Sequence, residues 1–154
     1  MDFLIELEFA EKIVLSLLIG ALLGLEREHS KQQEVVGLRT FALVSLLGCL
    51  LGVLGHPLLL NASYLPVLGF LAVGILSIAL YVSNLFKFHE IGMTTTVALL
   101  LSYAIGLLVS MESYAEAVFI AVTVALVLFA KEKLHTMVRH ITHKEMLDLL
   151  EFLI

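Results

Sequence analysis

The sequence predicts an all-α integral membrane protein with five membrane-spanning helices. Of its 154 residues, 60% are hydrophobic and only 15% are charged, whereas soluble domains carry about 45–50% apolar and about 25% charged residues. The mean hydropathy is +1.05. The apolar residues form continuous runs, unlike the alternating segments of about 10 residues that build a membrane β-barrel. A lipid-facing helical bundle is therefore the predicted fold class.

Each predicted span is an apolar run bounded by charged or turn-forming residues. A hydrocarbon core of about 30 Å needs roughly 17–25 helical residues, and lipid favours helices because their backbone groups bond internally. The charged stretch Glu26–Glu34 ends the first run, and Pro57 and Pro66 mark the loop after the second. The five predicted spans cover about residues 9–25, 38–55, 65–86, 94–109 and 115–130 of a single domain.

Residues 131–154 are predicted to form a cytoplasmic amphipathic tail. Leu134, Met137, Val138 and Ile141 follow the i, i+3, i+4, i+7 pattern of an amphipathic helix. Thr142–Glu145 then reads as a capping box that starts a mostly apolar helix. We expect this segment either to lie on the membrane surface or to begin the second part of a longer membrane protein.

The distribution of basic residues predicts the orientation of the chain. With five spans, one side of the membrane holds eight basic residues and the other holds only Lys12. Basic loops stay in the cytoplasm, so we expect the N-terminus outside and the C-terminus in the cytoplasm. The eight are Arg27, Lys31, Arg39, Lys87, Lys131, Lys133, Arg139 and Lys144.

The outer side is predicted to be acidic. Six acidic residues against Lys12 give it the whole formal net charge of −5, because the cytoplasmic charges cancel. Such a field would concentrate cations at the outer mouth of the bundle. The alternative, which we favour, is that these are ordinary solvated loop residues. The six are Asp2, Glu6, Glu8, Glu11, Glu112 and Glu116.

Glycines are spaced for close helix packing. Gly20 and Gly24 form one GxxxG pair, and Gly48 and Gly52 form another that Gly55 extends. Small residues let membrane helices approach at their backbones. The spacing does not distinguish a partner helix in the same chain from one in a second copy, and we expect the protein to form a homodimer in the lipid bilayer.

The densest polar cluster joins the first two spans. It comprises Glu26, Arg27 and Glu28, followed by Arg39 and Thr40. Because a charge near lipid is costly unless paired, we predict that Glu26 or Glu28 pairs with Arg39. The carboxylates are alternatively ligands for a hard cation such as Mg²⁺, which takes one or two carboxylates and keeps several waters. Spacing alone favours the structural ion pair.

A second polar cluster opens the fourth span. Glu90 precedes Thr94 and Thr95, and the hydroxyls either line a polar path or bond to the helix backbone. Glu90 is a candidate cation ligand. In the favoured alternative, a threonine caps the helix and Glu90 is a solvated loop acid.

The sequence carries no enzyme signature. GxSxG, HExxH and the phosphate-binding loop are absent. We therefore expect a protein that is not an enzyme and has neither a nucleic-acid partner nor a firmly indicated cofactor, with Mg²⁺ as the candidate ion.

Two sets of segments resemble the signatures of MgtC/SapB membrane proteins. The first and more specific set is Leu18–Arg27, Gly37–Thr40 and Ala42–Ser45. The second, looser set is Gly69–Leu71, Gly92–Thr95 and Ile105–Gly106. Longer relatives often carry Glu after the threonine pair, where this chain has Thr96. The resemblance covers about residues 13–130, and the tail resembles the junction to a second membrane half.

The resemblance implies a bacterial or archaeal inner-membrane protein tied to magnesium homeostasis. Two functions then remain open. In the first, the protein transports Mg²⁺ and Glu26, Glu28 and Glu90 supply ligand oxygens. In the second, it is a regulatory subunit that binds another membrane protein and transports nothing itself.

Overall fold

The computed structural model describes residues 2–30, 36–55, 62–88 and 93–138. Within these residues the chain is all-helical, with five α-helices and no strand. The predicted fold class is confirmed to that extent. The helices are α1 (Asp2–Ser30), α2 (Leu38–Gly55), α3 (Leu65–Phe88), α4 (Met93–Ser110) and α5 (Tyr114–Val138).

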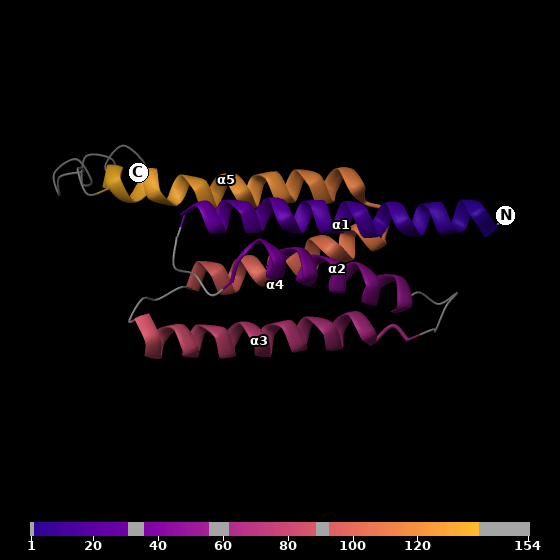
Figure 1. Cartoon of the computed structure of the whole chain (residues 1–154), viewed down its shortest axis with the longest axis horizontal. Helices are drawn as coiled ribbons and strands as arrows, with labels where there is room; N and C mark the ends of the chain where they lie inside the picture. Colours follow the sequence, from indigo (N-terminus) through magenta and orange to yellow (C-terminus); the bar gives the residue numbers. More distant parts are fainter. Residues whose placement is uncertain (1, 31–35, 56–61, 89–92, 139–154) are drawn as a thin grey trace, which may run out of the picture.

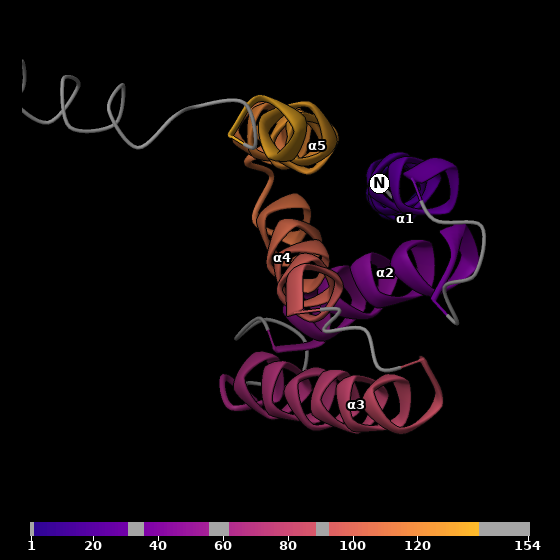
Figure 2. The ribbon, with the colours of Figure 1, turned by 90° about the vertical axis from the view of Figure 1, so that its left-hand side faces the viewer.

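Successive helices run back and forth along one axis (Figure 1). The N-terminus of α1 and the last described turn of α5 therefore lie at opposite ends of the bundle. Seen along that axis, α2 and α4 occupy the centre, with α3 on one side and α1 and α5 on the other (Figure 2). Helix α4 contacts each of the other four described helices.

The helix bounds agree with the predicted spans in the middle of the chain and differ at its ends. Helix α2 has the predicted bounds, and α3 and α4 extend them by one or two residues. Helix α1 starts at Asp2 and ends at Ser30, well beyond its apolar run. Helix α5 runs through position 130 to Val138 without a break, so the predicted tail begins as its continuation. Residues 139–154, with the predicted capping box and last apolar helix, lie outside the described residues.

Three described helices are long and apolar enough to cross a membrane. They are Leu38–Gly55, Leu65–Ser83 and Met93–Ser110, and the apolar part of α5, Tyr114–Ala130, is shorter. In α1, Lys12 and Glu26 enclose an apolar run that measures roughly 20 Å as a helix. The chain is a multi-pass membrane protein.

The outward faces of the bundle are apolar. Ile75 on α3 and Phe119 on α5 are 70% and 74% exposed. In water such helices would have a polar outer face. Their outer side chains therefore match hydrocarbon as the surrounding medium.

The central pair, α2 and α4, meets at its backbones. A β-carbon at Gly48 would strike the carbonyl of Tyr103, and one at Gly106 would strike the carbonyl of Ser45. The buried Ser102 hydroxyl donates to the carbonyl of Phe41 at 3.0 Å. Close approach through small residues is the main packing device in lipid, and here it fixes the middle of the bundle.

Tyr103 connects the central pair to α3. Its hydroxyl donates to the carbonyl of Pro66 at 2.8 Å, and its ring is fully buried. Gly69 leaves the space that the phenol occupies, because a β-carbon there would collide with Tyr103 Oη. The Phe70 ring lies beside it, with centroids 6.0 Å apart. Since a buried phenol needs a hydrogen-bond partner, this contact positions the first turn of α3.

Candidate functional site at one end of the bundle

The predicted polar residues gather where α1 ends and α2 and α4 begin. Helices α2 and α4 run in the same direction, so both start at this end of the bundle (Figure 1). The C-terminal end of α1 and the N-terminal ends of α2 and α4 thus lie at this end of the bundle, as do the last described turns of α3 and α5. Neither α2 nor α4 has an acidic residue in its own first turn, so negative charge for these N-termini must come from elsewhere.

Arg27 is the central residue of this end. Its side chain is 2% exposed, and its Nε donates to Glu26 Oε2 at 3.2 Å. The Glu26 side chain is 12% exposed. Arg27 Nη2 is buried and has no hydrogen-bond partner among the described residues. A buried ion pair is costly to form and costlier to break, because the remaining charge is left uncompensated.

Glu28 completes the start of α2. Its Oε2 accepts a hydrogen bond from the backbone N–H of Leu38 at 3.3 Å. Gly37 lies next to this carboxylate. A β-carbon at Gly37 would be 3.3 Å from Glu28 Oε2. A carboxylate at this position satisfies one of the first N–H groups of the helix and complements its dipole. Glu28 therefore caps α2 from the preceding helix.

The predicted pairing of Glu26 or Glu28 with Arg39 is wrong for the described residues. Glu26 contacts Arg27, and Glu28 contacts the Leu38 N–H. The Arg39 side chain is exposed, and no ion pair joins it to another described residue. Arg27 is the inward residue because it continues the buried face of Leu23, one helical turn further along.

Helix α2 and helix α4 each place threonines at this end. Thr40 is half-buried in the first turn of α2. Thr94 is half-buried and Thr95 is 5% exposed at the start of α4. Glu90 lies outside the described residues. The Mg²⁺ site of Glu26, Glu28 and Glu90 therefore stays a prediction, and the part of the chain that the structure describes contains no group of three His, Cys, Asp or Glu suited to a metal.

The predicted packing glycines all face other helices of the same chain. On α1, a β-carbon at Gly20 would lie 2.6 Å from the carbonyl oxygen of Phe41, and one at Gly24 would lie 2.5 Å from Leu38 Cα. Gly48 and Gly52 face Tyr103 and Ser110 of α4, and Gly55 faces Pro66. These surfaces are used within one bundle, so a homodimer would need a different surface.

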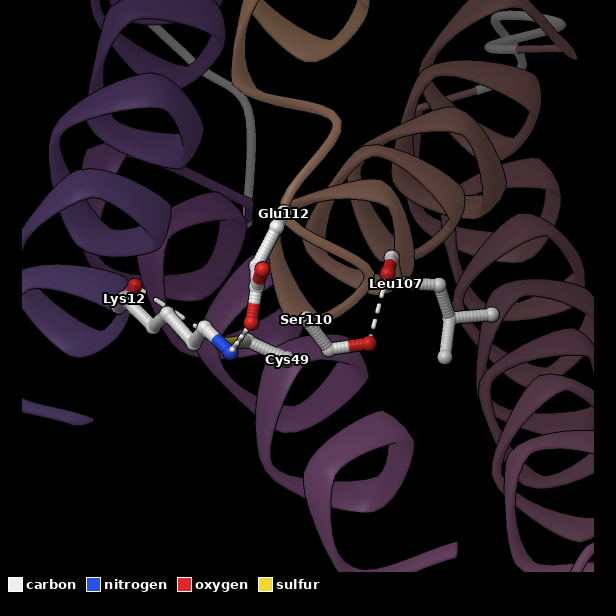
Figure 3. Close-up of polar contacts among 5 residues, drawn as sticks. All are labelled: Lys12, Cys49, Leu107, Ser110 and Glu112. Atoms are coloured by element: carbon white, nitrogen blue, oxygen red, sulfur yellow. Dashed lines mark hydrogen bonds and ion pairs between the residues drawn. The ribbon is translucent and has the colours of Figure 1, made fainter. Parts of the chain in front are cut away.

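At the opposite end, an ion pair connects α1 to the turn between α4 and α5. Lys12 Nζ lies 2.8 Å from Glu112 Oε1, as Figure 3 shows. The Lys12 side chain is 14% exposed, and that of Glu112 is 66% exposed. The carbonyl of Lys12 also accepts a weak bond from the Cys49 thiol at 3.7 Å. Three segments that are distant in sequence therefore meet at this corner.

Glu112 has an unusual backbone. Its φ is 65°, a region that glycine adopts far more easily. Ser113 N donates to the Leu108 carbonyl and Glu112 N to the Val109 carbonyl, both at 3.1 Å. This is the Schellman arrangement that ends many helices. Glycine usually occupies this position of the motif. Here the position is a glutamate, whose side chain pairs with Lys12.

Sequence reasoning missed Arg27 as the buried charge and Glu112 as the partner of Lys12. Both left a signal. Arg27 follows Gly20 and Gly24 on the face that packs against α2. Lys12 is the lone base on an acidic side, and a half-buried ammonium there requires an acidic partner.

Comparison with known proteins gives one match. Residues 13–137 match the family model described as the MgtC family. The matched range includes all of α2, α3 and α4 and most of α1 and α5. No curated protein and no solved structure matches the chain.

Proposed function

Because the chain belongs to the MgtC family, we propose that it is a bacterial or archaeal inner-membrane protein that serves magnesium homeostasis. It acts there without conducting Mg²⁺ itself, as a regulatory subunit that binds another membrane protein. The observation that carries this proposal is the closed centre of the bundle, where α2 and α4 touch at their backbones.

The buried side chains support this reading. Among the described residues, the buried polar groups are five hydroxyls and the guanidinium of Arg27. The hydroxyls belong to Ser16, Ser45, Ser77, Thr95 and Ser102. Mg²⁺ dehydrates reluctantly and favours carboxylates, whereas the nearly buried Glu26 carboxylate is already paired with the Arg27 guanidinium. Such a centre favours a structural role over a conducting one.

The decisive experiment combines cells with liposomes. The purified protein should give no Mg²⁺ entry above that of empty liposomes, measured with an entrapped indicator and with an ionophore as positive control. The same protein should restore growth at low Mg²⁺ to a strain that lacks it. Activity in cells with silent liposomes supports regulation. Flux that falls in Glu26→Gln but persists in Glu116→Gln, a carboxylate at the other end, would contradict it.

Transport is the second candidate, and the acidic end favours it. Glu8, Glu11, Glu112 and Glu116 are all exposed there, with Lys12 as the only base. A cluster of this kind raises the local concentration of cations. In this candidate, Glu26 and Glu28 are the carboxylates that receive the ion at the opposite end. The liposome measurement separates the two candidates directly.

The proposed topology is five crossings with the N-terminus outside. The alternating directions of the five helices support it, as does the position of Arg27 and Arg39 at one end and Lys12 at the other. Helices α1 and α5 then cross with apolar runs shorter than those of α2–α4.

Single-cysteine labelling tests this topology. Cys49 is the only cysteine, so a Cys49→Ala background is free of thiols. A cysteine at position 63, in the turn before α3, should react with a membrane-impermeant maleimide added to intact cells. A cysteine at position 39 should react only after the membrane is opened. The reverse pattern would overturn the orientation, and reaction of both from outside would overturn the number of crossings.

A further inference from the structure

A groove runs between α4 and α5 on the outward side of the bundle. It encloses about 390 Å³. Its α4 wall includes Met93, Val97 and Leu101, and its α5 wall includes Val124, Val127 and Leu128. The groove is separate from the Arg27–Glu26 pair and from the Lys12–Glu112 pair.

The groove arises from how the two helices diverge. They meet at the short turn that joins Ser110 to Tyr114, where the small buried residues Ala117 and Ala121 let α5 lie close to its neighbours. Away from that turn α4 inclines toward α3, and α5 stays beside α1 (Figure 1). Space therefore opens along the first turns of α4.

The walls of the groove are almost entirely apolar. None of the described residues that line it is ionisable. The Thr123 hydroxyl, which borders it, donates to the Phe119 carbonyl at 2.8 Å and so is satisfied by its own helix. Water is not held in an apolar space without polar partners. Hydrocarbon is the medium that fits.

One end of the groove lies at the basic end of the bundle. Met93 begins α4 there, and α5 continues past Leu128 to Lys131 and Lys133. Position 131 lies four residues after Val127 and three after Leu128, on the same face of the helix. A basic residue is thus placed by helical register at the mouth of an apolar groove, and basic pockets between membrane helices bind anionic lipid headgroups.

We propose that this groove binds one acyl chain of an anionic phospholipid whose headgroup lies at the basic end of the groove, level with position 131 of α5. A second helix is the wrong shape for it. A helix with its side chains is about 10–12 Å across, too wide for a groove between two helices that touch each other, whereas an extended hydrocarbon chain is thin. The lipid would fill the space that the divergence of α4 and α5 leaves open.

The test uses native mass spectrometry and thermal unfolding of the whole protein in detergent. Dioleoyl phosphatidylglycerol and dioleoyl phosphatidylcholine are the probes, since they share acyl chains and differ in headgroup charge. We expect one phosphatidylglycerol retained per chain and stabilisation by that lipid over phosphatidylcholine. Equal retention of both lipids, or retention of neither, overturns the proposal.

Val127→Trp fills the groove from α5 and should lower phosphatidylglycerol retention about tenfold, because each displaced methylene contact weakens binding. Leu126→Trp is the matched control, since positions 126 and 127 are 61% and 64% exposed and Leu126 does not line the groove. Val97→Phe obstructs the opposite wall and keeps the test valid if Val127→Trp does not fold.

Lys131→Gln separates the headgroup from the acyl chain. It should abolish the preference for phosphatidylglycerol while leaving weak binding of both lipids. Undiminished preference overturns the assigned headgroup position. If Val127→Trp and Val97→Phe keep full lipid retention but change the oligomeric state, the groove holds a second copy of the chain and the proposal is wrong.

Discussion

At the scale of single residues, two ion pairs define the ends of the bundle, and they differ in burial. The Arg27–Glu26 pair is nearly inaccessible, whereas Glu112 in the Lys12–Glu112 pair is two-thirds exposed. Exposed pairs contribute about 0–1 kcal/mol. Removing one partner of a buried pair costs about 3–5 kcal/mol, because a charge is left without compensation. The two ends should therefore respond very differently to mutation.

Arg27→Met should destabilise the protein by about 3 kcal/mol because it removes a buried guanidinium that pairs with the Glu26 carboxylate. The double variant Arg27→Met/Glu26→Gln should recover much of that loss. Unfolding titrations in detergent give the coupling between the two changes. Arg39→Met is the control and should lie within about 0.5 kcal/mol of the parent, since Arg39 is exposed. Additive effects at Arg27 and Glu26 would argue against a coupled pair.

Replacement of Glu112 by alanine should destabilise the protein more than replacement by glycine. Glu112→Ala loses the Lys12 contact and keeps a side chain at a φ of 65°, so we expect destabilisation of about 1 kcal/mol. Glu112→Gly loses the same contact but gains backbone freedom of about 1 kcal/mol, so its stability should stay near that of the parent. Thermal unfolding of both variants isolates the backbone contribution. Equal loss in both would mean that the ion pair, and not the backbone, dominates.

At the scale of helices, the sequence predicted most of what later proved regular. Continuous apolar runs located α2, α3 and α4 within two residues, because in lipid the hydrophobic length sets the helix length. The ends of α1 and α5 were missed, since charged residues extend a helix into water without leaving an apolar signal. The partner of Lys12 lies 100 positions away, a contact that only the packing of α1 against the α4–α5 turn creates.

The α2–α4 contact should be the most sensitive to added volume. Gly106→Ala places a β-carbon against the Ser45 carbonyl, and overpacking of this kind costs about 1–3 kcal/mol. Gly74→Ala is the matched control, because a β-carbon there has no atom within 4 Å and alanine favours the helix by up to about 1 kcal/mol. Detergent unfolding should show loss in the first variant and a small gain in the second. Tolerance of Gly106→Ala would mean that the two helices can separate at little cost.

At the scale of the whole molecule, the bundle is short. Helices α2 and α4 have 18 residues each, about 27 Å in length, and the apolar run of α1 is shorter still. A bilayer thicker than the protein must thin or the helices must rearrange, at a cost that grows with each ångström of mismatch. The two central helices are therefore matched to a thin membrane.

Reconstitution into bilayers of graded thickness tests this match. Thermal stability should be highest with acyl chains of 14–16 carbons and should fall as the chains lengthen to 22 carbons, through hydrophobic mismatch. A soluble-domain fusion reporter unaffected by lipid serves as the internal control. Stability that rises steadily with chain length would contradict a bundle of this length.

The central position of α4 also has a consequence for the order of assembly. Helix α3 touches only α2 and α4 among the described helices, and α5 touches only α1 and α4. Ribosomes deliver the chain from its N-terminus, so α1 and α2 can dock as soon as both are inserted. Helix α3 must then remain in lipid with only part of its contacts until α4 arrives. Insertion of α4 is thus the step that joins the earlier helices into one bundle. Cellular quality control has the longest time to act on the nascent chain just before α4 is inserted.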